Sequence, residues 1–280
     1  MIQDILPLEL NNSYTEALPV DNSPVICFKD RRILVSVNEL ARTMDFPRWR
    51  VLKGPEPVYL FSIGEEKYFL IMDPDERPDG FDWYDLRALR EKKMESRWKL
   101  FAAFTGLHLW NWYQTNRFCG ACGCKTVQDH TERALVCPAC GNRIYPRINP
   151  AVIIGVTNGD SLLLTKYNRG YAHNALVAGF TEIGETLEQT VCREVKEEVG
   201  LRVKNIRYYK SQPWGIASDI LMGFYCDVDG EDVIKMDNHE LKYAAWVKRE
   251  EIELQPTDDS LTNEMMKLFK FGGPAAVGVQ

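Results

Sequence analysis

The chain has no hydrophobic run close to the roughly 20 residues that a membrane-spanning helix needs. The segment from Met1 to Asp4 also lacks the basic residues and the apolar stretch of a secretory signal. Excess positive charge is missing as well. The formal net charge is −6 at pH 7, which disfavours broad, charge-driven binding to nucleic acids. We therefore expect a cytoplasmic protein that does not bind a membrane.

The composition is that of a globular protein long enough for two domains, with 45% hydrophobic and 26% charged residues among 280. In residues 1–84, short apolar runs flank turn-forming segments, as in Val25 to Phe28 followed by Ile33 to Val35. Val58 to Ile63 and Lys67 to Met72 repeat this pattern. It predicts a β-rich N-terminal domain, for which we expect a structural or dimerising role.

A linking helical segment is predicted at 85–116, where glycine and proline are scarce. Apolar residues recur there at spacings of three and four, which is typical of the buried face of a helix. This stripe consists of Trp98, Phe101, Thr105, Leu109 and Trp112.

The second half of the chain alternates strands with two helices, which predicts a mixed α/β or α+β layered fold. The helices are expected from about Thr186 to Val199 and from about Ser260 to Phe269, and a flexible tail is expected at 271–280. Strands are expected at 151–156, 162–164, 176–180, 203–209, 220–228 and 244–247.

Four cysteines have the spacing of a zinc ribbon. Cys119 and Cys122 form one C-x2-C pair, Cys137 and Cys140 form another, and 14 residues separate the pairs. Thiolates on two such turns can close a tetrahedron around zinc. Because four cysteines leave no open coordination position, we expect a structural zinc ion. Cys124 is interpreted as a spare thiol, and the core is predicted to contain Cys27, Cys192 and Cys226.

A nucleic-acid-binding ribbon is the alternative interpretation. Five basic residues outnumber two acidic ones between Asn116 and Asn149, but zinc with four thiolates contributes two negative charges. The resulting electrostatic signal for RNA is weak.

The candidate catalytic residues are carboxylates on the helix that is predicted from about Thr186 to Val199. Thr186 and Gln189 have the spacing of a capping box, and Gly200 supplies a stop signal. Val191, Val195 and Val199 recur every fourth residue and define a buried stripe.

On a helical wheel, Glu198 falls inside that stripe, and Glu194 and Glu197 lie on its flank. Unpaired carboxylates at the edge of a core are costly, and they repel one another unless a cation lies between them. Hard oxygen ligands suit Mg²⁺ or Mn²⁺, which can also bind substrate phosphates. Arg193 is interpreted as a structural partner that orients the carboxylates.

The segment from Gly179 to Leu201 resembles the Nudix box, Gly-x5-Glu-x7-Arg-Glu-U-x-Glu-Glu-x-Gly-U with U aliphatic, at every fixed position. The resemblance implies an α+β Nudix sandwich, a mixed sheet between helices, that hydrolyses a nucleoside diphosphate linked to another group. It implies Mg²⁺ or Mn²⁺ bound by Glu194, Glu197 and Glu198, with Glu185 supporting the loop and the helix. Glu240 matches a late glutamate of the family that can bind metal, and either Glu198 or Glu240 takes the proton from water.

Two flanking features resemble the NADH pyrophosphatase subfamily, namely the ribbon before the box and Ser211-Gln212-Pro213-Trp214 after it. The resemblance implies cleavage of NAD(H) to AMP and nicotinamide mononucleotide, removal of NAD caps from RNA 5′ ends, and a homodimer. Phe180 and Trp214 would then stack on the nicotinamide, and Tyr145 and Ile153 would line the pocket. For Phe180, Tyr145 and Ile153, ordinary core packing is the alternative.

The signature departs from the subfamily after Trp214, where Gly215-Ile216-Ala217-Ser218-Asp219 replaces Pro-Phe-Pro-x-Ser. The substrate therefore stays open between NADH, NAD⁺, NAD-capped RNA and ADP-ribose. A non-catalytic nucleotide or RNA sensor is the alternative from a different class, but the complete glutamate set argues against it. The predicted segments are a β-rich domain at 1–84, a helical link at 85–116, a zinc ribbon at 117–147, a Nudix domain at 148–270 and a tail at 271–280.

Overall fold

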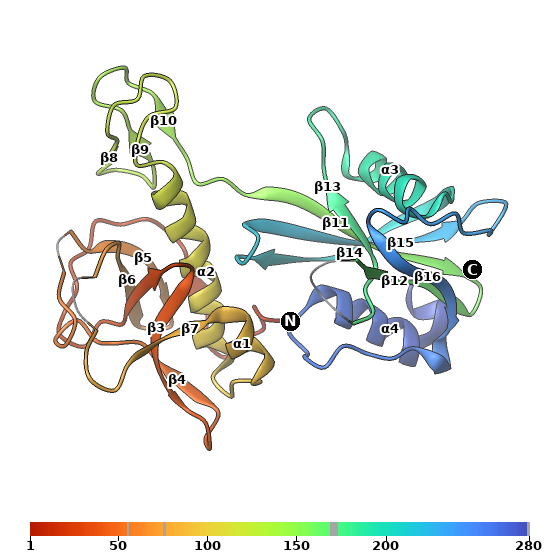
Figure 1. Ribbon diagram of the computed structural model, residues 1–280, viewed down its shortest axis with the longest axis horizontal. Helices are drawn as coiled ribbons and strands as arrows, with labels where there is room; N and C mark the ends of the chain where they lie inside the picture. Colours follow the sequence, from red (N-terminus) through yellow and green to blue (C-terminus); the bar gives the residue numbers. More distant parts are fainter. Residues whose placement is uncertain (55, 75–76, 169–172, 279–280) are drawn as a thin grey trace. The chain divides into compact units, whose positions relative to one another are not determined.

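A computed structural model describes residues 1–54, 56–74, 77–168 and 173–278 (Figure 1). The chain divides into two compact units. The N-terminal unit contains residues 2–148 and 214–218, and the C-terminal unit contains Met1, residues 149–213 and residues 219–280. No helix within the described residues is long and apolar enough to cross a membrane.

The N-terminal unit is built on a seven-stranded sheet of order β1-β5-β6-β2-β3-β4, with β7 paired to β3. The two pairs of apolar runs that flank turn-forming segments each form a hairpin, since β2 pairs with β3 and β5 pairs with β6 in antiparallel fashion. The strands are β1 (Leu10–Asn11), β2 (Val25–Lys29), β3 (Arg32–Asn38), β4 (Thr43–Asp45), β5 (Val58–Ile63), β6 (Glu66–Ile71) and β7 (Asp82–Asp85).

The linking segment contains two helices, α1 (Leu86–Glu91) and α2 (Arg97–Thr115), rather than one. Lys93 has a φ of 53° and lies in the break between them. Of the predicted stripe, Phe101, Leu109 and Trp112 are buried. Helix α2 also buries Ala102, Ala103, Phe104 and Leu107, so its buried surface is wider than the stripe.

The ribbon consists of β8 (Val127–Gln128), β9 (Leu135–Val136) and β10 (Arg143–Ile144), and it packs on the β-rich sheet within the N-terminal unit. Arg133 donates a hydrogen bond to the backbone oxygen of Leu60 on β5. Tyr14 Oη donates to the backbone oxygen of Asp129 at 3.0 Å. Leu135 is buried in the same hydrophobic cluster as Leu60. The ribbon and the sheet therefore share one core.

The C-terminal unit has a mixed sheet of order β14-β15-β11-β12-β16, with β13 paired to β11. Strands β11 and β15 are parallel, while β11–β12, β11–β13 and β12–β16 are antiparallel. All six predicted strands are confirmed, mostly with wider bounds: β11 (Asn149–Asn158), β12 (Ser161–Tyr167), β13 (Val177–Phe180), β14 (Val203–Trp214), β15 (Asp219–Val228) and β16 (Leu241–Lys248).

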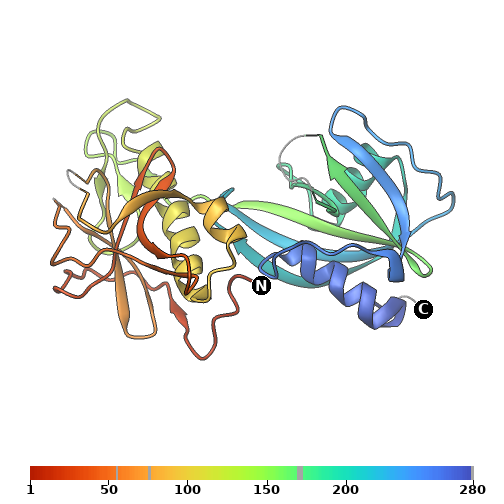
Figure 2. The same cartoon turned by 60° about the horizontal axis from the view of Figure 1, so that its bottom comes forward.

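Helices α3 (Leu187–Val199) and α4 (Leu261–Ala276) pack on opposite faces of this sheet (Figure 2). Alternation along β11 explains the two cores, because successive side chains of a strand point to opposite faces. Val152, Ile154 and Val156 join the cluster that contains the valines of α3, whereas Ile153 joins the cluster that contains α4. This arrangement confirms the predicted mixed sheet between helices.

Helix α4 extends beyond the predicted end at Phe269 and occupies much of the predicted tail. It continues to Ala276 through a kink at Gly273, which has a φ of 68°. Val277 is buried, and its backbone oxygen accepts a hydrogen bond from Arg207 Nε at 2.9 Å. These contacts hold the segment against the sheet.

Gln212 of the Ser-Gln-Pro-Trp motif is fully buried beneath the start of α4. Its Nε2 donates to the backbone oxygen of Asp259 at 2.8 Å, and its Oε1 accepts from the backbone N–H of Leu261 at 2.7 Å. Leu261 is the first residue of the helix, whose initial N–H groups have no partner within the helix. Gln212 thus serves as a helix cap supplied by a neighbouring strand.

We predict that Gln212→Ala destabilises the C-terminal unit by about 1–3 kcal/mol, because it removes two buried hydrogen bonds to backbone groups. Urea unfolding followed by circular dichroism measures the change. Lys204→Ala on the same strand is the control, since an exposed substitution shifts stability by no more than about 0.5 kcal/mol. Equal stability of the two variants would contradict the capping role.

Candidate active site

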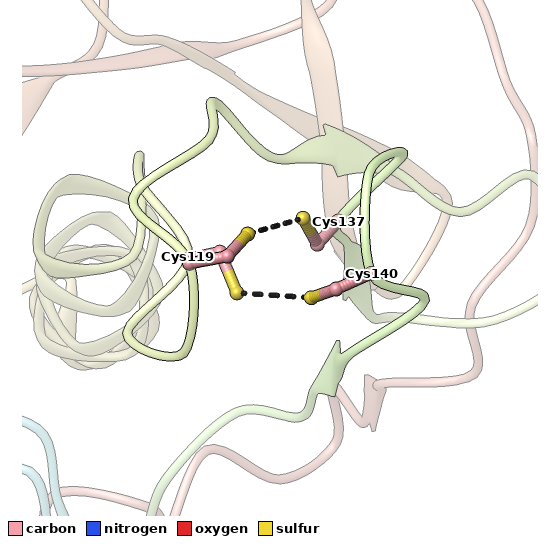
Figure 3. A group of neighbouring side chains, drawn as sticks. Cys119, Cys137 and Cys140 are labelled. Atoms are coloured by element: carbon pink, nitrogen blue, oxygen red, sulfur yellow. Dashed lines mark hydrogen bonds between the residues drawn. The ribbon is translucent and has the colours of Figure 1, made fainter.

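The four predicted zinc ligands converge in the ribbon. Their sulfur atoms all lie within 4.8 Å of one another, and Figure 3 shows the group. Cys119 Sγ is 3.7 Å from Cys140 Sγ, and Cys122 Sγ is 3.4 Å from Cys137 Sγ. Backbone hydrogen bonds from Ala121 and Cys122 lower the pKa of the Cys119 thiol to about 6. Four converging cysteine sulfurs fit a structural zinc ion.

The remaining cysteines lie outside this group. Cys27 and Cys226 are buried, as predicted. Cys192 is exposed, so its predicted core position is wrong, because it lies one residue beyond the buried Val191 and turns to the outer side of α3. Cys124 is exposed as well, and its backbone oxygen accepts a hydrogen bond from the Cys119 N–H.

Helix α3 begins and ends at the predicted signals. Thr186 Oγ1 accepts from the Gln189 N–H, and Gln189 Oε1 accepts from the Thr186 N–H, which completes the capping box. Gly200 ends the helix with a φ of 73°. These local bonds set the rotation of the helix, and therefore the direction of its glutamates.

Arg193 connects the loop before α3 to the helix. Its Nε and Nη2 donate to the two carboxylate oxygens of Glu185 at 2.6 and 2.9 Å, and Nη2 donates to the Phe180 backbone oxygen at 2.9 Å. Its Nη1 donates to Glu194 at 2.7 Å and to Glu197 at 3.0 Å. Hydrogen bonds from Arg193 are the largest influence on Glu185 and lower its pKa to about 2. Glu185 therefore stays ionised and supports the loop.

Glu194 lies directly over the backbone of β13. A Cβ added at Gly179 would be 1.9 Å from Glu194 Cδ, closer than any real contact allows. The first glycine of the box is thus required by the space that this carboxylate occupies. Burial, which leaves the Glu194 residue 9% exposed, raises its pKa, while Arg193 opposes the shift.

Glu198 is buried inside the valine stripe, as the helical wheel predicts, and is 2% exposed. Burial, followed by the charges of Glu194 and Glu240, raises its pKa to about 8. Glu240 lies in the turn before β16 and is close enough to influence both helix carboxyls. Glu197 is exposed over 61% of its side chain. The three helix glutamates therefore differ strongly in their solvation.

The cysteines are the one group of three or more His, Cys, Asp or Glu residues in the described part of the chain whose ligand atoms gather within 4.8 Å. The glutamates are more widely spaced, because Glu194 and Glu197 turn toward Arg193. Their chemistry nevertheless fits a hard divalent cation, since Glu194, Glu198 and Glu240 bring like charges together at the edge of a core.

Residues 147–269 match the NUDIX domain, and residues 114–145 match the NADH pyrophosphatase zinc ribbon domain. The chain carries a Nudix domain.

Two curated relatives are similar to this chain over the ribbon and Nudix region. The NAD-capped RNA hydrolase NudC of Pectobacterium atrosepticum is 39% identical over 163 residues, which cover 58% of this chain and 62% of the relative. The protein of the same name from Enterobacter sp. is 40% identical over 164 residues, covering 58% and 63%. The chain thus matches less than two thirds of the length of these relatives.

Among solved structures, the crystal structure of a NUDIX hydrolase from Nitrosomonas europaea is 23% identical to this chain. It has a TM-score of 0.49, and the match covers 55% of this chain and 90% of that one.

The residues expected to bind the nucleotide occupy varied environments. In the Nudix domain, Phe180 is 53% exposed, whereas Ile153 is buried in the α4 cluster. In the N-terminal unit, Tyr145 is 53% exposed and its hydroxyl donates to Glu132 at 3.0 Å. The Trp214 ring packs 5.5 Å from the Phe104 ring, with the Arg90 guanidinium 5.0 Å from its centroid.

Two residues at the end of β12 contact Glu198 and Glu240 and were not predicted. Tyr167 Oη lies 3.3 Å from Glu198 Oε1, and the Asn168 N–H donates to the Glu240 backbone oxygen at 2.8 Å. Neither residue belongs to the box. The one signal in the sequence is that both residues come shortly after the predicted apolar strand at 162–164, which leads toward the box.

We predict that the ribbon holds one zinc ion per chain, to be measured by inductively coupled plasma mass spectrometry. Cys122→Ser should lose the zinc and lower the thermal stability of the N-terminal unit, because a structural zinc site contributes directly to folding. Cys124→Ser is the matched control and should retain the full zinc content. Zinc loss in both variants would contradict the assignment of ligands.

Without Mg²⁺ or Mn²⁺, the C-terminal unit should lose stability as the pH rises from about 4.5 to about 8. The Glu198 pKa is raised from 4.5 to about 8 in the folded chain, so in this range the unfolded carboxyl releases a proton that the folded one keeps. Urea midpoints at pH 5, 6, 7 and 8 measure the slope. Glu198→Gln should flatten it, and an unchanged slope would refute the assignment.

Proposed function

We propose that this chain is a metal-dependent hydrolase that cleaves the diphosphate of NAD(H) to AMP and nicotinamide mononucleotide, including the NAD cap of RNA 5′ ends. The observation that carries the proposal is the gathering of Glu194, Glu198 and Glu240, with Glu197 beside them, at the edge of the Nudix core. Support comes from the zinc ribbon match and from the relatives named NAD-capped RNA hydrolase NudC.

Mg²⁺ or Mn²⁺ is the proposed catalytic cofactor, with Glu194, Glu197, Glu198 and Glu240 as its ligands. When bound, such ions neutralise diphosphate oxygens and acidify a water molecule. Arg193 keeps Glu194 and Glu197 oriented, since its Nη1 donates to both. Either Glu198 or Glu240 accepts the proton from water. Glu198 is buried and Glu240 is exposed, so Glu240 can release the accepted proton to solvent more directly.

Phe180 is the residue that we propose stacks on the nicotinamide, because its ring is largely exposed at the end of β13. Aromatic rings bind bases through their faces with little dependence on base identity. Trp214 and Tyr145, both in the N-terminal unit, are proposed as further nucleotide-binding residues. Ile153 is proposed to support the pocket from within the core, because it is buried there.

A homodimer is proposed from the resemblance to the NADH pyrophosphatase subfamily. We also propose the cytoplasm as the compartment, because the ribbon needs four thiols that stay reduced.

Incubation of the 280-residue chain with NADH and Mn²⁺ or Mg²⁺, followed by chromatography, tests the function. The expected products are AMP and the reduced mononucleotide. Intact NADH with hydrolysed ADP-ribose would move the assignment to a different nucleoside diphosphate derivative. Tight NAD binding with metal but without products would indicate a nucleotide sensor. Rates on NAD-capped RNA and on free NADH, measured side by side, establish which substrate is preferred.

We predict that Glu197→Gln lowers turnover by about 100-fold or more, since loss of even an indirect metal contact costs about 10–100-fold. The fold should be retained, because this side chain is 61% exposed. Glu188→Gln, an exposed substitution in the first turn of the same helix, is the control and should leave turnover within about twofold. Equal rates in the two variants would contradict the role of Glu197 as a ligand.

A further inference from the structure

The end of β12 contacts both Glu198 and the turn that carries Glu240. Side chains alternate along this strand, so Leu163 and Tyr167 face the cluster around α3 while Leu162 and Leu164 face α4. The pairing with β16 shifts register between Lys166 and Tyr167. Regular pairing therefore ends where Tyr167 and Asn168 begin to contact the acidic residues.

Tyr167 contacts the side chain of Glu198. Its hydroxyl lies 3.3 and 3.4 Å from the two carboxylate oxygens, and 3.5 Å from the backbone oxygen of Leu176. The ring is packed against the α3 hydrophobic cluster. Because the ring is held by packing and the carboxylate is buried, the hydroxyl can restrict Glu198 to one orientation.

Asn168 contacts the turn that carries Glu240. Its backbone N–H donates to the Glu240 oxygen at 2.8 Å. Its Nδ2 lies 2.9, 3.2 and 3.3 Å from the backbone oxygens of Asn238, His239 and Leu241. One side-chain amide thus approaches three carbonyls of the same turn.

The same turn is attached to the end of α3. The Asp237 N–H donates to the Glu198 backbone oxygen at 2.8 Å, and the Lys235 N–H donates to the Val199 oxygen at 2.9 Å. Helix, turn and strand end therefore form a closed set of contacts around the two carboxylates. Removal of one contact from this set should loosen a carboxylate without unfolding the sheet.

We propose that Tyr167 and Asn168 are positioning residues of the hydrolase site: Tyr167 orients the Glu198 carboxylate, and Asn168 holds the Glu240 turn, so that adjacent residues set the spacing between two cation ligands. This inference rests on the proposed function. It adds two residues outside the Nudix box to the machinery of the site.

Tyr167→Phe in the full chain tests the first half. Mn²⁺ binding is measured by electron paramagnetic resonance of the free ion, and kcat and KM are measured with NADH. We expect the half-saturating Mn²⁺ concentration to rise about 10-fold and kcat to fall by a similar factor, with KM changed less than about twofold. Tyr243→Phe removes a hydroxyl from the neighbouring strand and should change none of these values.

Asn168→Ala tests the second half with the same measurements, and a similar loss of Mn²⁺ affinity is expected. Double variants separate positioning from general destabilisation, because the effects of substitutions at two residues that act through one another are not additive. In a Glu198→Gln background, Tyr167→Phe should change Mn²⁺ binding less than about twofold. In a Glu240→Gln background, Asn168→Ala should do the same.

Unchanged Mn²⁺ binding and kcat in both single variants would overturn the inference, and so would fully additive losses in the double variants. If the parent chain fails to cleave NADH while Tyr167→Phe still weakens Mn²⁺ binding, the substrate assignment fails and the positioning role stands. If the parent cleaves NADH and the variants match it, the function stands and the positioning role is rejected.

Discussion

The guanidinium group of Arg193 joins the box loop, the end of β13 and helix α3, and the geometry of the candidate site depends on it. It binds both oxygens of Glu185 on one side and reaches Glu194 and Glu197 on the other. Arginine suits this position because its planar fork matches a carboxylate and stays charged at any physiological pH. The loop and the helix therefore cannot shift independently.

The opposite side of the site has no such compensation from Arg193. Glu198 is buried near Glu194 and Glu240, and its carboxylate is contacted by the Tyr167 hydroxyl. Like charges in a poorly solvated position raise the cost of ionisation, and a divalent cation offsets that cost. We therefore expect the affinity for the proposed cation and the stability of the Nudix domain to be coupled. We expect the same coupling for zinc in the ribbon, because the ribbon shares a core with the β-rich sheet.

The sequence was sufficient to predict α3 and its glutamates, because capping, helix termination and the valine stripe are local patterns. It was also sufficient to predict that the four cysteines of the ribbon converge, because their spacing is diagnostic. The contacts of Tyr167 and Asn168 were beyond it, since their partners lie 31 and 70–73 residues away and depend on strand register. The environment of Trp214 was likewise unpredictable, because its neighbours Phe104 and Arg90 come from helices far earlier in the chain.

The close approach of the Glu194 carboxylate to Gly179 has an evolutionary consequence. The Glu194 carboxylate fills the volume that any side chain at residue 179 would need. Positions 179 and 194 are therefore constrained as a pair, and a larger residue on the strand becomes tolerable only after the helix gives up its long acidic group. In a descendant that had lost the proposed hydrolytic activity, both positions would be released together, so their joint drift would record that loss.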